Sequence, residues 1–143
     1  MKNDIKSKKY HIGIVVAEFN YDLTEAMLKK GIEHAELLNL EVKKIFKVPG
    51  SFDTPYGVKQ IIDKVDGIAV FGVVLEGETQ HDEVVAMHAA RKLMDLSVEY
   101  NKPVTLGIIG PGANRLQAEE RIEEYAKRAI EALAKLLKRA DES

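Results

Sequence analysis

The feature that most constrains the fold is the nine-residue apolar run GIAVFGVVL at residues 67–75. A run in which polar and apolar residues do not alternate predicts a strand covered on both faces, as strands of parallel sheets are. It is about half as long as the roughly 20 apolar residues that a membrane helix needs. The run HIGIVVAEF at residues 11–19 has the same character, and we expect it to be a central strand of the same sheet.

Segments with helical periodicity alternate with the predicted strands. Two further strands are expected at residues 41–48 and 103–110, and lysines on one side of the first indicate an edge strand. Helices are expected over residues 21–38, 54–64, 79–100 and 115–139. Crossovers of this length imply parallel pairing with right-handed connections. We therefore predict an α/β fold, a three-layer sandwich in which helices flank a four-stranded parallel sheet.

Length and composition limit the class of protein. The 143 residues suit a single domain, which we place at residues 11–143 after a flexible tail at residues 1–10. The net charge of -2 provides no large basic surface for nucleic acid. The chain has no cysteine and no closely spaced histidine pair, so thiol chemistry is excluded and a metal site is not favoured. Without an export signal or a membrane span, we expect a cytoplasmic protein that binds no membrane.

Four unusual loops follow the predicted strands: EFN, PGSFD, EGETQH and GPGANR. In a parallel α/β sheet such loops meet at one edge, where ligands bind. Phe19 and Phe52, in the first two loops, are interpreted either as lids over the local core or as a stacking platform for a planar ligand. Asp53 either favours a helix end through its charge or accepts hydrogen bonds from a ligand.

The third and fourth loops each lead into a predicted helix N-terminus. Thr79 and Asp82 resemble a capping box, and the backbone amides of the same helix end can receive a phosphate. His81, held there, is a candidate for proton transfer near neutral pH. In the last helix, Arg115 and Arg121 either bind phosphate or form surface ion pairs. Neither glycine-rich loop matches a nucleotide-binding pattern.

Taken together, these segments resemble the 6,7-dimethyl-8-ribityllumazine synthase family in its archaeal form. The matching segments, in order along the chain, are VVAEFN, VPGSFDTP, GVVLEGETQHDEVV, KPVTLGI and GPGANRLQAEER. The resemblance implies a flavodoxin-like sheet of strand order 2-1-3-4 and an enzyme of riboflavin biosynthesis. The reaction would condense 5-amino-6-(D-ribitylamino)uracil with 3,4-dihydroxy-2-butanone 4-phosphate, releasing phosphate and water and using no cofactor.

The resemblance also implies roles for single residues. Phe19 would stack on the uracil ring, His81 would transfer protons and Arg121 would bind the phosphate. Leu106 would be supplied by the neighbouring subunit of a homopentamer. The other implied contacts are Ser51, Phe52 and Asp53 at the ribityl chain, Val73, Val74 and Leu75 at the pyrimidine, and Glu78 and Thr79 at the butanone phosphate.

Some alternatives stay open at this point. In place of a glycine-rich loop of bacterial relatives the chain reads EEYAKRA, so contact of Lys127 or Arg115 with phosphate is undecided, as is the choice between a pentamer and a cage of pentamers. The archaeal riboflavin synthase is a minor alternative, because it lacks the GETQH pattern. A non-catalytic flavin or lumazine carrier, or a self-assembling shell, would use Phe19 and Phe52 equally well but would not need His81 or Arg121.

Overall fold

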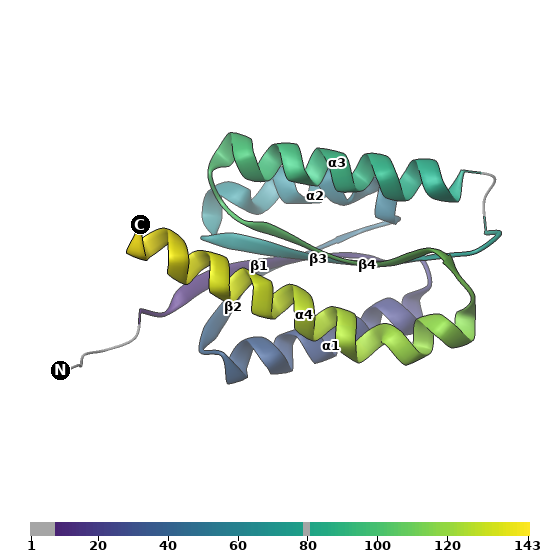
Figure 1. The fold of residues 1–143 in the computed structure, drawn as a ribbon, viewed down its shortest axis with the longest axis horizontal. Coiled ribbons are helices and arrows are strands. Elements are labelled where there is room, and N and C mark those ends of the chain that lie inside the picture. Colours follow the sequence, from purple (N-terminus) through teal and green to yellow (C-terminus); the bar gives the residue numbers. More distant parts are fainter. Residues whose placement is uncertain (1–7, 79–80) are drawn as a thin grey trace.

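The computed structural model describes residues 8–78 and 81–143. Helices cover both faces of a central sheet, so the predicted three layers are confirmed (Figure 1). Within the described residues the strands are β1 (Tyr10–Ala17), β2 (Leu40–Val48), β3 (Gly67–Leu75) and β4 (Val104–Ala113). The helices are α1 (Tyr21–Leu37), α2 (Thr54–Ile61), α3 (Asp82–Tyr100) and α4 (Arg115–Glu142), with the 3₁₀ turns η1 (Ser51–Asp53) and η2 (Ile62–Lys64).

The strands pair in the order β2-β1-β3-β4, and every pairing is parallel, which confirms the expected topology. One row across the sheet joins Phe46, Val15, Val70 and Leu106. β2 is an edge strand, as its lysines predict, whereas every residue of β3 is buried. Because all strands run the same way, their carboxyl ends lie at one edge, and the strand order reverses between β1 and β3.

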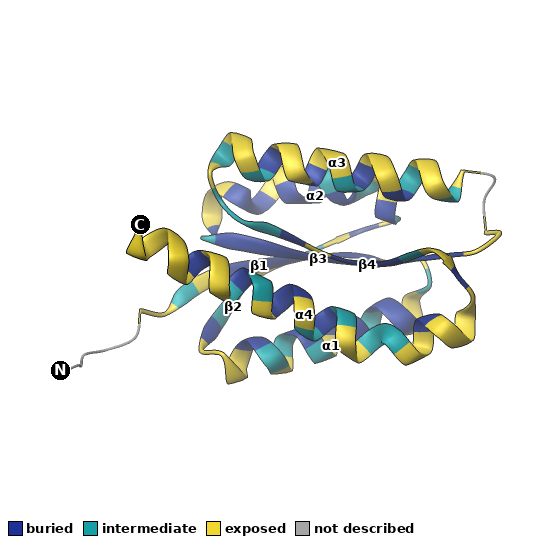
Figure 2. Cartoon of the chain, viewed as in Figure 1, coloured by how far each residue is buried: buried dark blue, intermediate teal, exposed yellow. Residues whose placement is uncertain are grey.

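The apolar core has two parts, one on each face of the sheet (Figure 2). Phe71 is fully buried under α1 and α4, where it contacts the helix at Gly31. A Cβ on Gly31 would come within 2.6 Å of the Phe71 ring, so only glycine lets α1 approach this closely. On the other face, Val70 packs with Val58 of α2 and Leu93 of α3. Full burial of each such side chain stabilises the fold by about 1.5–3 kcal/mol.

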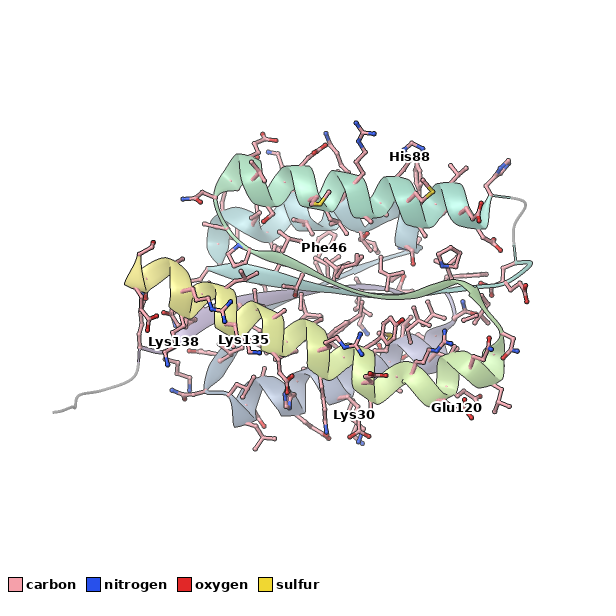
Figure 3. The ribbon with its side chains drawn as sticks, viewed as in Figure 1. Lys30, Phe46, His88, Glu120, Lys135 and Lys138 are labelled. Atoms are coloured by element: carbon pink, nitrogen blue, oxygen red, sulfur yellow. The ribbon has the colours of Figure 1, made fainter. Side chains whose placement is uncertain are left out.

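The outer faces of the helices are charged. In Figure 3, Lys30 of α1 and Glu120 of α4 point away from the sheet, whereas Phe46 of β2 lies in the layer between the sheet and α2. Phe46 packs against the buried residues of that layer. Across residues 8–78 and 81–143, no helix combines the length and the apolar character that crossing a membrane requires.

Several element boundaries differ from the sequence-based expectation, and two of the differences lie at the carboxyl edge of the sheet. The third long helix begins at Asp82 and not at Thr79, which lies outside the described residues. The last strand continues beyond Gly110 to Ala113, and it is irregular on the way, with φ angles of +96° at Gly110 and +91° at Gly112 that glycine adopts readily. After this irregularity, Ala113 resumes pairing with β3.

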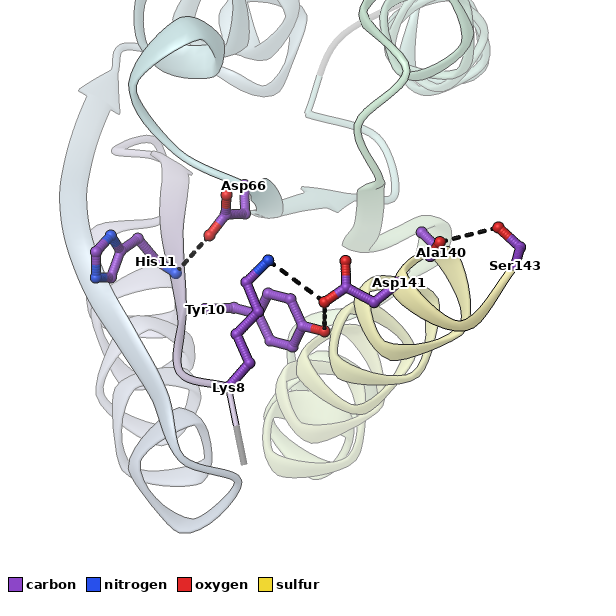
Figure 4. A network of polar contacts seen from close by, with 7 residues as sticks. All are labelled: Lys8, Tyr10, His11, Asp66, Ala140, Asp141 and Ser143. Atoms are coloured by element: carbon purple, nitrogen blue, oxygen red, sulfur yellow. Dashed lines mark hydrogen bonds and ion pairs between the residues drawn. The ribbon is translucent and has the colours of Figure 1, made fainter. Parts of the chain in front are cut away.

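Polar contacts join the start of β1 to the end of α4, at the edge of the sheet opposite to the carboxyl ends of the strands (Figure 4). The Tyr10 hydroxyl donates a hydrogen bond of 2.5 Å to the Asp141 carboxylate of α4, and Lys8 Nζ lies 3.3 Å from the same group. The backbone amide of His11 donates to Asp66 over 2.8 Å. The bond to Asp141 raises the pKa of Tyr10 to about 12 and lowers the pKa of Asp141.

Candidate active site

The loops that follow β1, β2 and β3 are joined by hydrogen bonds at the carboxyl edge of the sheet. The Phe19 amide donates to the Pro49 carbonyl over 2.9 Å, which extends the β1–β2 pairing into the loops. Asn20 Nδ2 donates to the Val73 carbonyl and to Glu78 Oε1, both over 3.0 Å. The three predicted loops therefore form one connected rim.

A hollow of about 180 Å³ lies inside this rim. Its lining consists of Phe19, Gly50, Ser51, Phe52, Val73, Val74, Glu78, Asp82 and Val85, and so includes six of the predicted contact residues. Phe19 is 57% exposed and Phe52 63%. Rings that covered the local core would be buried, so this exposure favours the interpretation in which they stack on a flat ligand.

Two larger hollows lie beside α3, one toward α2 and one toward β4, and volume alone would favour them over the hollow at the rim. One, of about 410 Å³, is lined by Phe52, Pro55, His88, Ala89, Arg91, Lys92 and Asp95. The other, of about 570 Å³, is lined by Met87, Ala90, Arg91, Leu93, Met94, Val104 and Leu106. Each contains a single predicted contact residue, so the smaller hollow at the rim is the better candidate.

The PGSFD loop is fixed in place by its own hydrogen bonds. Asp53 Oδ2 accepts from the Gly50 amide over 3.0 Å, and the Thr54 hydroxyl donates to the Ser51 carbonyl over 2.8 Å. The Ser51 side chain sits over Gly72 of β3, where a Cβ would come within 2.5 Å of Ser51 Oγ. Asp53 thus makes a capping bond at the start of η1, and the position of the Ser51 side chain depends on a glycine in the neighbouring strand.

His81 directly precedes α3 and is exposed, and it is not among the residues that line the hollow. Its carbonyl accepts from the Val85 amide over 2.8 Å, and both Asp82 and Val85 line the hollow. Asp82 Oδ2 accepts from the Gly77 amide over 2.8 Å. His81 is therefore next in sequence to a residue that lines the hollow, and its role in proton transfer stays a prediction.

Leu106 and Arg121 are not brought to the hollow within one chain. Leu106, 49% exposed, pairs with Val70, three residues before Val73, which places it about 10 Å from the rim along the sheet. Arg121 belongs to α4, which covers the face of the sheet opposite to α3 (Figure 2). A single chain therefore holds only part of the predicted set.

The other basic residues that the sequence left undecided are engaged in ion pairs. Arg115 binds Asp22 of α1, and Lys127 Nζ lies 2.7 Å from a Glu123 carboxylate oxygen. The bond to Glu123 raises the pKa of Lys127. Among the residues that the structure describes, Arg121 has no ion-pair partner. Arg121 is therefore the arginine better suited to bind a phosphate from outside its own helix.

Sequence reasoning missed Asn20, which follows Phe19 directly. Asn20 adopts the left-handed conformation, with φ 64° and ψ 48°, and its side chain joins two loops. Asparagine is several-fold enriched in that conformation, so an asparagine between a strand and a helix was the available signal. Thr79, predicted at the phosphate, lies outside the described residues.

A parallel sheet with a ring-lined hollow beside the reversal of strand order defines the class: an α/β protein that binds a small molecule at the carboxyl edge of its strands. The sequence profile that describes 6,7-dimethyl-8-ribityllumazine synthase matches residues 9–141. The chain therefore belongs to the 6,7-dimethyl-8-ribityllumazine synthase family.

Curated relatives that carry this family name come from several archaea. The protein of Saccharolobus solfataricus is 56% identical, with 94% of this chain and 89% of the relative covered. The protein of Aeropyrum pernix is 57% identical, with 94% of this chain and 93% of the relative covered. The protein of Staphylothermus marinus is 56% identical, with 90% of this chain and 87% of the relative covered. Among solved structures, a de novo designed Rossmann fold protein aligns with a TM-score of 0.39 at 18% identity, covering 82% of this chain and 97% of its own.

Proposed function

We propose that this protein is an enzyme of riboflavin biosynthesis. It condenses 5-amino-6-(D-ribitylamino)uracil with 3,4-dihydroxy-2-butanone 4-phosphate to 6,7-dimethyl-8-ribityllumazine, releasing phosphate and water. The observation that carries the proposal is the hollow at the carboxyl edge of the sheet, where six residues expected to contact substrate line one space in a chain of this family.

The chemistry suits a site of this composition. The uracil amine adds to the ketone carbonyl and water leaves, phosphate is then eliminated, and the second nitrogen closes the ring with loss of water. These steps need two reactants held in register and protons moved between nitrogen and oxygen atoms. Phe19 stacks on the pyrimidine, Ser51 and Asp53 hold the ribityl chain, and His81 transfers the protons.

The complete site forms between two copies of the chain. Leu106 and Arg121 lie away from the hollow of their own chain, so a neighbouring copy supplies them. Met87 and Met94, 66% and 64% exposed, line the apolar hollow beside Leu106. An exposed apolar surface of this kind is typical of an interface between proteins. We propose a homo-oligomer, either a pentamer or a cage of pentamers, and a cytoplasmic location, as expected from the sequence.

A comparison of turnover with affinity distinguishes the enzyme from a carrier. Both proteins would bind a lumazine or flavin ring through Phe19 and Phe52, which a fluorescence titration with riboflavin measures. Only the enzyme would also accelerate lumazine formation from the two substrates, which absorbance follows. Tight ring binding with no rate above the spontaneous reaction would support the carrier and contradict the proposed function.

A further inference from the structure

One oxygen of the Glu78 carboxylate accepts hydrogen bonds from two donors in different parts of the chain. Glu78 Oε1 accepts from the Leu75 backbone amide, at the end of β3, over 3.0 Å. It also accepts from Asn20 Nδ2 over 3.0 Å, and the same Nδ2 donates to the Val73 carbonyl. We call this set of four residues the Asn20–Glu78 clasp.

Backbone hydrogen bonds also hold Asn20 in place. Its carbonyl accepts from the amides of Leu23 and Thr24, over 2.9 Å and 3.0 Å, so it begins α1. Its left-handed conformation is one that few residues other than glycine and asparagine adopt without strain. Phe19 precedes it directly. The clasp therefore ties the loop that carries the stacking ring to the end of β3.

The partners of the Glu78 carboxylate decide between contact with a phosphate and a structural role. A carboxylate gains nothing by approaching a phosphate, because like charges repel. Its observed partners are two N–H donors, which suit a carboxylate.

We propose that Asn20 and Glu78 are positioning residues: the clasp sets the Phe19 loop relative to the end of β3, where Val73 and Val74 line the same hollow as Phe19. This inference rests on the proposed function, and it assigns Glu78 a role other than contact with the butanone phosphate. What matters in Glu78 is an acceptor oxygen and not a negative charge or a proton.

The test compares Glu78→Gln with Glu78→Ala. Gln keeps an oxygen that accepts from both Leu75 and Asn20, whereas Ala removes it. We expect Glu78→Ala and Asn20→Ala each to lower kcat roughly 10- to 100-fold, the loss that misplacement by about 1 Å causes. The affinity for the pyrimidine substrate should change less than kcat. Glu78→Gln should keep kcat within a few-fold of wild type.

The double variant Asn20→Ala/Glu78→Ala should lose less than the two single losses combined, because both substitutions remove the bond between Asn20 and Glu78. Asn39→Ala is the matched control, since Asn39 has φ 60° at the other end of α1, and it should leave kcat unchanged. If Glu78→Gln is as slow as Glu78→Ala, Glu78 acts through its charge and the proposal is wrong. Additive losses in the double variant would overturn it as well.

Amide hydrogen exchange at Leu75 reports on the clasp without any turnover. Glu78→Ala should exchange faster there than wild type, and Glu78→Gln should not. If the wild type is active and Glu78→Ala changes neither kcat nor the exchange rate at Leu75, the positioning role of the clasp is wrong and the proposed function stands. A wild type that protects Leu75 but turns over no substrate contradicts the proposed function, and the positioning role with it.

Discussion

We propose that His81 is the proton carrier of this site. It lies one residue before Asp82, which lines the hollow, whereas His11 lies at the opposite edge of the sheet, 3.3 Å from Glu41. A proton carrier at this point contributes about 10²- to 10⁴-fold to a rate. We expect His81→Ala to lower kcat within that range and to leave assembly and ring binding intact.

Steady-state kinetics and sedimentation of His81→Ala check this expectation, with His11→Ala as the matched control that should keep full activity. A His81→Ala protein as fast as wild type would remove the assignment. A protein that no longer assembles would show that His81 supports structure and not proton transfer.

The contact between Tyr10 and Asp141 predicts how stability depends on pH. The pKa of Tyr10 is raised, so its contribution is complete below about pH 10, its ordinary pKa, and is lost as pH rises through about 12. The pKa of Asp141 is lowered, so its contribution is complete above about pH 4 and is lost as pH falls further. Tyr10→Phe lacks the bond, so between pH 5 and 9 it should be less stable than wild type.

Denaturant unfolding of wild type and Tyr10→Phe across the pH range measures this difference. The stability gap should be constant at neutral pH and should close above about pH 12. Equal stability of the two proteins at every pH would show that Tyr10 stabilises the protein through its ring alone, because phenylalanine keeps the ring.

Among the elements, β3 positions the site through a glycine. Gly72 leaves room for the Ser51 side chain of η1, and an added Cβ would lie 2.5 Å from Ser51 Oγ. Gly72→Ala therefore displaces the loop that carries Ser51 and Phe52, at a cost of about 1–3 kcal/mol in the free energy of unfolding. Riboflavin should also bind more weakly, because Phe52 moves with the loop.

Denaturant unfolding and a fluorescence titration measure the two effects. Gly50→Ala is the matched control in the same loop, because the nearest atom to its added Cβ lies 3.6 Å away. Equal stability and affinity in the two variants would show that Ser51 has no need of the space at Gly72.

The elements differ in how far the sequence could predict them, for physical reasons. β3 was predicted at its observed bounds because a continuous apolar run has one stable place, inside the sheet. The start of α3 was missed because Thr79 and Asp82 resemble a capping box in the sequence, whereas in the structure the Asp82 side chain accepts from the Gly77 amide. The clasp was missed because it joins Asn20 to Glu78, far apart in sequence, through contacts that only the folded chain creates.

For the whole molecule, the distance of Leu106 and Arg121 from the hollow predicts complementation between copies. If one chain supplies His81 and the neighbouring chain supplies Arg121, two different inactive variants can form a complete site at the interface between them. His81→Ala and Arg121→Ala should each be impaired alone, the second mainly in KM for the phosphate substrate. Loss of a charge-assisted hydrogen bond, about 1.5–3 kcal/mol, corresponds to roughly 10- to 100-fold in that KM.

Unfolding the two variants together and refolding them as a mixture should restore part of the wild-type activity, because some interfaces then combine an intact His81 with an intact Arg121. Each variant refolded alone is the control. Activity of the mixture equal to the mean of the two controls would place both residues in the same chain and contradict a shared site.

The central claim is that this chain catalyses the condensation at the rim of its sheet, and the initial rate of lumazine formation tests it most directly. The purified protein is mixed with both substrates, and the rate is compared with the spontaneous reaction in buffer. We predict a rate proportional to protein concentration that saturates with each substrate. A rate equal to that in buffer at every protein concentration would contradict the account.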